Sequence, residues 1–196
     1  MATAVSICSN ALVMLGDKPI NDFSESQGAG GLDRARIASN LWPTVRDSVL
    51  RSHPWNCAMK RTILSPLVDA PAFEWSHQFL LPSDWLRNHQ INGLHVDEVD
   101  YVTEGGRLLM NQSSCYLRYV FRNTNIETWD PILVDACELY MAARMAKPVT
   151  GSDTDGERLM RLFENKVRLA RTVDGQDDSP QQLGSFEILN ARRGYR

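Results

Sequence analysis

The stretch from Gly31 to Arg61 reads GLDRARIASNLWPTVRDSVLRSHPWNCAMKR, and it predicts a long amphipathic helix followed by a packed turn. Apolar residues recur at helical spacing and define one face suited to burial: Ala38, Leu41, Trp42, Val45, Val49 and Leu50. Pro43 predicts a kink or a short break near Leu41–Trp42, because it removes a backbone donor and crowds the preceding turn. The helix should end before Pro54, since a proline disfavours helical geometry in the residue ahead of it. Trp55 then places a large apolar ring beside the helix end.

The other faces of this helix are mostly basic, with Arg34, Arg36, Arg46 and Arg51. Two interpretations are open. The basic face could meet an acidic patch on a neighbouring copy of the chain, since a ring joins two different patches of one surface. It could instead contact nucleic acid, as the helix of a regulator does. The sequence has no compact helix-turn-helix pattern, and its formal net charge of −3 argues against nucleic-acid binding through charge alone.

Further helices are expected on both sides of this stretch. The first should run from Ala4 to Leu15, with Thr3 as its cap and Gly16 at its end. Another should begin at Asp130 and Pro131 and end at Pro148. Its buried stripe is Val134, Cys137, Met141 and Met145, with Glu138 expected at a solvated position or, alternatively, in an ion pair between subunits. The last helix should begin at Ser152 or Asp153 and end at Gly175, with a buried face of Leu159, Leu162, Phe163, Val167 and Ala170.

The segment 62–123 loses helical spacing and contains Pro66, Pro71 and Pro82. Short strands are expected at Phe79–Leu81, Trp85–Arg87, Val99–Thr103, Arg107–Met110 and Tyr116–Phe121. Glu104-Gly105-Gly106 is typical of a hairpin turn. The prediction is an α+β fold: a four-helix body from residues 1–61 and 124–175, a small antiparallel β-lobe inserted at 62–123, and an extended C-terminal tail at 176–196.

Composition is ordinary for a soluble protein, with 43% hydrophobic and 23% charged residues among 196. No apolar run approaches the ~20 residues that span a bilayer, so we expect no membrane contact, and the N-terminus does not resemble a signal peptide. Four widely spaced cysteines are expected to be reduced thiols: Cys8, Cys57, Cys115 and Cys137.

The sequence offers little catalytic chemistry. Asp47, His53 and Cys57 are close in sequence, but His-Pro-Trp-Asn-Cys is more typical of a helix stop and a packed turn than of a Cys–His pair. His77, His89 and His95 lack the spacing of metal ligands and are expected at the surface or in turns. We therefore expect no catalytic residues, no metal site and no cofactor.

Three segments of the chain resemble a known family. SICSNALVMLGDKPINDFSES, LWPTVRDSVLRSHPWNCAMKR and FLLPSDWLR are similar to the tail tubular protein A family, the head-to-tail adaptors of short-tailed phages. The matching positions are Leu15 to Ile20, Trp42 to Arg61 and Pro82 to Arg87. Cys57 stands where that family commonly has an aromatic residue. The motifs cover the first half of the chain; the second half matches in length and helix order.

The resemblance implies a structural virion protein that forms a homo-oligomeric ring, most often of twelve copies, at the head–tail junction. It would be made in the host cytoplasm and would join the portal protein to the tail nozzle protein around the DNA channel, without sequence-specific DNA binding. The helical body would form the ring, with Arg34, Arg36, Arg46 and Arg51 at the subunit interface, and the β-lobe would face the nozzle. The alternative is a helical DNA-binding or regulatory protein that uses the basic face of residues 34–51.

The polar segment Gln176 to Arg196 has too few apolar residues to form a core. Its apolar cluster and basic end have the composition of a segment that folds on a partner, which the resemblance identifies as the portal ring. The expected portal-binding residues are Phe186, Ile188, Leu189, Arg192, Arg193, Tyr195 and Arg196. A disordered solubility tail is the alternative.

Overall fold

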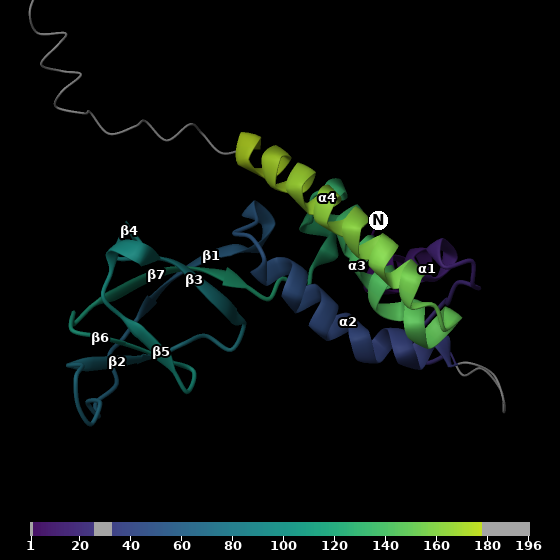
Figure 1. Ribbon diagram of the computed structural model, residues 1–196. Coiled ribbons are helices and arrows are strands. Elements are labelled where there is room, and N and C mark those ends of the chain that lie inside the picture. Colours follow the sequence, from purple (N-terminus) through teal and green to yellow (C-terminus); the bar gives the residue numbers. More distant parts are fainter. Residues whose placement is uncertain (1, 26–32, 178–196) are drawn as a thin grey trace, which may run out of the picture.

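The computed structural model describes residues 2–25 and 33–177 (Figure 1). Four helices form a body, α1 (Ala4–Met14), α2 (Arg34–Arg51), α3 (Pro131–Thr150) and α4 (Asp153–Asp177), and every named strand lies between α2 and α3 in the sequence. Figure 1 shows the strands gathered at one end, with α2 reaching from them to α1, α3 and α4. The predicted α+β fold with an inserted β-lobe is confirmed. No helix in the described ranges is long and apolar enough to cross a lipid bilayer.

Two antiparallel sheets build the β-lobe. The first has the order β1-β7-β3-β4 and the second β2-β6-β5. The strands are β1 (Met59–Leu64), β2 (His77–Leu80), β3 (Trp85–Ile91), β4 (Leu94–His95), β5 (Val102–Glu104), β6 (Arg107–Met110) and β7 (Cys115–Phe121). Gly105 and Gly106 turn the β5–β6 hairpin at φ 53° and 74°, values that favour glycine. The boundary expected between residues 61 and 62 falls inside β1, which the sequence pattern missed.

Local chemistry sets the start and end of the first two helices. Thr3 caps α1 in a reciprocal hydrogen-bonded pair with Ser6, and Gly16 follows the helix at φ 77°. The side chain of Asp33 accepts from the backbone N–H of Arg36 at the start of α2. This helix runs continuously through Pro43 and ends at Arg51. Of the kink or short break expected near Leu41–Trp42, the break is therefore excluded, while the end ahead of Pro54 is confirmed.

The last two helices are longer than the sequence predicted. Helix α3 continues past Pro148 to Thr150, because a proline in the last turn removes a single helical hydrogen bond. Gly151, at φ 74°, is the residue that ends it. Helix α4 passes through Gly175 and ends at Asp177, so residues 176 and 177 are helical rather than part of a tail. Leu162, expected to be buried, is 43% exposed.

Tryptophans concentrate in the main hydrophobic core, which the helices share with the β-lobe. Trp42 stacks on Trp129 with ring centroids 6.5 Å apart, and Trp55 is 1% exposed. Leu86 of β3 and Val120 of β7 belong to the same cluster of buried residues. A second cluster lies inside the β-lobe. The two parts of the fold are therefore joined by continuous apolar packing.

Candidate interaction surfaces

Polar contacts reinforce the junction between α2 and the β-lobe. The Nε of Arg122, just after β7, donates to Oδ2 of Asp47 in α2 at 2.8 Å. Arg51, at the end of α2, donates to the backbone carbonyl of Leu86 and lies over the Trp85 ring, 6.0 Å from its centroid. Together with the apolar packing of Leu86 and Val120, these contacts hold α2 against β3 and the end of β7. We call this set of contacts the joint.

Asp84 provides a third polar link near the joint. Its carboxylate accepts from Lys60 Nζ at 2.8 Å and from the Tyr119 hydroxyl at 2.9 Å. Burial raises the pKa of Asp84, but the hydrogen bonds from Lys60 and Tyr119 outweigh burial, and the pKa lies below its ordinary value. The pKa of Tyr119 is raised by its own burial and by the Asp84 carboxylate. Asp84 therefore stays ionised and ties β1 and β7 to the turn before β3.

The four arginines expected at a subunit interface do not form one row of free charges. Arg34 pairs with Asp17, Arg46 with Asp47 at 2.8 Å, and Arg51 belongs to the joint. The hydrogen bond from Arg34 lowers the pKa of Asp17. Arg36 is different, since its side chain is 74% exposed, although it also contacts Asp33 at 3.2 Å. Arg36 is thus the member of this set best placed to meet another molecule.

Glu138 corrects another expectation. The sequence placed it in solvent or in an ion pair between subunits, but it is 9% exposed. Its Oε1 accepts from Asn10 Nδ2 at 2.7 Å, which links α3 to α1 within one chain. Burial raises the pKa of Glu138, partly opposed by the Asn10 hydrogen bond. Periodicity missed this contact because the partner is remote in sequence.

The cysteines and histidines lie at separate places. All four thiols are free, and Cys8, Cys115 and Cys137 are buried. Burial, followed by the Asp174 charge, raises the pKa of Cys57 to about 12, so its thiol is protonated at neutral pH. His77 and His89 are half-buried in strands, and His95 is exposed. Within residues 2–25 and 33–177, no three His, Cys, Asp or Glu side chains are placed to hold a metal ion.

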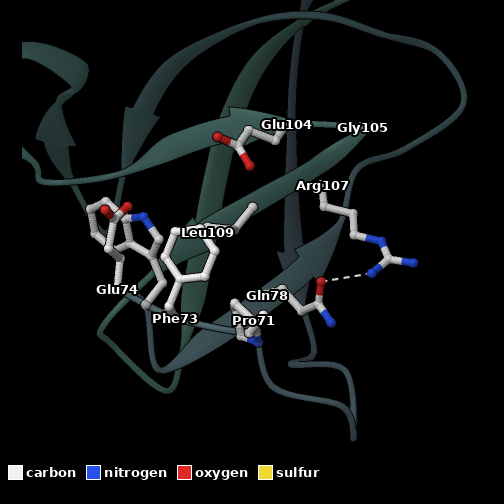
Figure 2. A pocket seen from close by; sticks show the side chains of 10 residues that line it. Pro71, Phe73, Glu74, Gln78, Glu104, Gly105, Arg107 and Leu109 are labelled. Carbon is white, nitrogen blue, oxygen red and sulfur yellow. Dashed lines mark hydrogen bonds between the residues drawn. The ribbon is translucent and has the colours of Figure 1, made fainter.

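The β-lobe carries a large cavity, of about 580 Å³, next to its second sheet. Figure 2 shows Phe73 and Glu74 of the preceding loop on one side and the Arg107–Gln78 contact on the other. Arg107 donates to Gln78 Oε1 at 2.7 Å, so one of its nitrogens is already used. Phe73 is 74% exposed, and Glu74 adopts φ 65°, which is uncommon outside glycine. The site has no convergent set of reactive groups.

The outer face of the first sheet is also exposed. Ile63 of β1 and Tyr116 of β7 are paired directly opposite each other and are 71% and 56% exposed. The next pair on this face is Arg61 with Arg118. Two apolar side chains beside two guanidinium groups have the composition of a protein-contact surface.

Sequence reasoning missed Arg87. The sequence pattern places Arg87 at the end of the Pro82–Arg87 motif and predicts no role for it. The structure places it in β3 beside Arg51, His89 and Trp85, in a cavity of about 400 Å³. The sequence signal for Arg87 was a basic residue directly after two apolar residues in a short strand. This signal was not enough to predict the pocket, because some of the residues around Arg87 come from other elements.

The expected portal-binding residues lie outside the described part of the chain: Phe186, Ile188, Leu189, Arg192, Arg193, Tyr195 and Arg196. Comparison with known proteins gives no family: no family model matches this sequence, and no curated protein matches it.

Proposed function

We propose that this chain is the head-to-tail adaptor of a short-tailed phage or prophage. It would assemble as a ring between the portal protein and the tail nozzle protein, around the channel through which DNA passes. Its action would be assembly rather than catalysis. The proposal starts from the three sequence segments that resemble the tail tubular protein A family.

The joint is the observation that carries the proposal. Two of the resembling segments meet there: Arg51, from Trp42 to Arg61, binds the carbonyl of Leu86, from Pro82 to Arg87. Asp84 and Lys60 pair across the same two segments at 2.8 Å. The unusual motif residues therefore fix the helical body to the β-lobe, which is where an adaptor needs rigidity if its two ends bind two different rings.

In this proposal the surfaces have separate partners. The helical body contacts neighbouring subunits, and Arg36 is the predicted interface arginine that remains well exposed. The β-lobe, with its exposed Ile63 and Tyr116, faces the nozzle. The C-terminal tail docks on the portal. The protein would function in the virion tail after synthesis in the host cytoplasm.

The test is a mass measurement on the purified full-length protein, alone and mixed with portal rings. We expect the mixture to contain a complex with a ring of adaptor copies on each portal, most simply a dodecamer. A chain that stays separate from the portal at high micromolar concentration contradicts the proposal.

A parallel measurement with duplex DNA addresses the alternative, a regulator that uses residues 34–51. Replacing Arg36 with Gln should weaken ring assembly in the adaptor. In a regulator it should instead weaken DNA binding and lower the salt dependence of that binding by about one unit of slope.

A further inference from the structure

A basic pocket lies where the end of α2 meets β3. It is the cavity of about 400 Å³ described above, and we define it by Arg51, Trp85, Arg87, His89, His95 and Tyr101. Asp97 is the one carboxylate among the described lining residues, and its Oδ2 lies 3.0 Å from His95 Nδ1. Arg51 and Arg87 line the same pocket and are the two arginines among those described residues.

Arg87 is the central group of this pocket. Within residues 2–25 and 33–177, its guanidinium group makes no hydrogen bond or ion pair, although the residue is half-buried. Burial lowers the pKa of Arg87, and the positive charges of Arg51 and then Arg171 lower it further. A partly buried cation beside two others is unfavourable unless an anion compensates it.

The charges of Arg171 and Arg87 also act on His53, which is not among the residues that line the pocket. Burial lowers the pKa of His53 to about 4, with further lowering by the charges of Arg171, Arg87 and then His89. The imidazole is therefore neutral at pH 7, even though its Nε2 lies 3.7 Å from Asp174 Oδ2. Asp174 is engaged elsewhere, since it accepts from the backbone N–H of Asn56 at 3.0 Å.

We propose that the basic pocket binds a phosphate group, with Arg87 as its main ligand and Arg51 beside it. The planar guanidinium fork matches two phosphate oxygens. The cavity has the volume of a small-ligand site, and the rings of Trp85 and Tyr101 line it beside the arginines. Aromatic rings next to basic groups are the combination that holds a nucleotide, with the base on the ring and the phosphate on the arginine.

This inference does not depend on the adaptor proposal, and it can fail while that proposal stands. The phosphate source is either a free ion or a nucleic-acid strand. The competing anion is a peptide carboxylate, which has no base to stack on the rings of Trp85 and Tyr101.

The experiment is a histidine NMR titration of the full-length protein. The probes are inorganic phosphate, a short thymidine oligonucleotide, a duplex of equal length and an acidic peptide of equal charge. We expect phosphate-bearing probes to raise the pKa of His53, because a bound anion offsets the field of Arg87 and Arg171. Tighter binding of the oligonucleotide than of inorganic phosphate identifies a strand as the source.

Matched variants locate the site. Arg87→Gln should weaken binding by about tenfold or more, the effect of one charged hydrogen bond, and Arg87→Lys should restore part of it. Arg161→Gln removes the same charge from the exposed face of α4 and should leave binding unchanged. Equal losses in Arg87→Gln and Arg161→Gln, no response of His53 to millimolar phosphate, or preference for the acidic peptide would each overturn the proposal. If Arg87→Gln does not fold, the test is the His53 titration of the unmodified protein: a raised pKa of His53 with phosphate supports the proposal, and an unchanged pKa overturns it.

Discussion

One backbone carbonyl organises the end of α2. Val49 accepts from the Ser52 N–H at 3.2 Å, the Ser52 hydroxyl at 2.7 Å and the Trp55 indole N–H at 2.9 Å. Carbonyls in the last turn of a helix have no helical donor, so they need partners of this kind. The third bond also fixes the orientation of the Trp55 ring in the main core, next to the joint.

We therefore expect Trp55→Ala and Trp42→Ala each to lower the free energy of unfolding by about 3–5 kcal/mol, as large truncations of buried aromatic rings do. Urea unfolding followed by circular dichroism measures the loss. Phe73→Ala is a suitable control, since that ring is 74% exposed and should contribute little. Unchanged stability in both tryptophan variants would rule out a structural role.

Glu138 provides a pH-dependent prediction. Burial raises its pKa above the ordinary value of 4.5, so the folded state binds a proton more tightly than the unfolded state does. Its contribution to stability is present below about 4.5 and is lost as the pH rises through the raised pKa. Glu138→Gln keeps an oxygen for Asn10 and removes the buried charge. This variant should melt at a higher temperature at pH 7, and the gain should shrink on acidification.

Glu157→Gln is the control for that comparison, because its side chain is 71% exposed. A gain that persists at low pH, or that Glu157→Gln reproduces, would show that the charge of Glu138 is not the cause.

The sequence pattern predicted which apolar residues are buried better than it predicted which polar residues contact each other. Trp42, Cys137 and Met141 are buried as predicted, because helical spacing places them on the buried faces of α2 and α3. Trp55, expected to pack just after the end of α2, is also buried. Glu138 and Arg87 were misjudged or missed, because their neighbours come from elements far away in the sequence. The same is true of Arg34 and Arg51, which periodicity placed on an open basic face and the fold uses in contacts within the chain.

At the scale of elements, helix starts were easier to predict than helix ends. Asp130 and Pro131 begin α3 through a side-chain hydrogen bond from the Ile132 N–H to Asp130, which is a local signal. Pro148 and Gly175 were predicted as helix ends, but α3 continues to Thr150 and α4 to Asp177. A proline in the last turn removes a single helical hydrogen bond, and a glycine within a helix costs only about 1 kcal/mol, so neither residue has to end a helix. Strand β1 was missed because exposed Lys60, Arg61 and Ile63 interrupt the expected alternation.

The joint can be tested as a unit with a double-mutant cycle on Asp47 and Arg122. Their side chains are 25% and 39% exposed and meet at 2.8 Å. We expect a coupling energy near the upper end of surface pairs, about 1 kcal/mol, because the pair borders the main core. Unfolding in urea of Asp47→Ala, Arg122→Ala and the double variant gives this value.

Lys147 and Asp153 form the matched control. They lie 3.1 Å apart but are 73% and 69% exposed, so their coupling should be about 0.2 kcal/mol or less. Equal coupling energies in the two pairs would mean that the Asp47–Arg122 contact is no stronger than an ordinary surface ion pair. That result would contradict a rigid connection between the helical body and the β-lobe.

At the scale of the whole molecule, the proposed role requires binding at several distant surfaces at once. The structure describes the helical body and the β-lobe, while the expected portal contact lies in a segment that only the sequence describes. That segment follows α4, which ends at Asp177. Ring assembly multiplies a weak contact, because each added copy binds at a raised effective concentration. A short segment with few apolar residues can therefore be enough to hold a ring in place.

Deleting residues 186–196 should abolish co-sedimentation with portal rings while leaving the helical circular-dichroism signal intact, because the deletion removes the proposed docking segment and none of the described core. A second variant replaces Phe186, Ile188 and Leu189 with Ser and keeps the chain length and charge. It should weaken sedimentation with the portal nearly as much if these apolar residues are the anchors. Replacing Arg192, Arg193 and Arg196 with Ser measures how much the basic residues contribute to portal binding. The difference in binding between this variant and the full chain should decrease at high salt, because salt screens exposed charges. If the truncated chain folds and binds portal rings as well as the full chain, the tail is not the docking element, and the portal contact must be sought on the helical body instead.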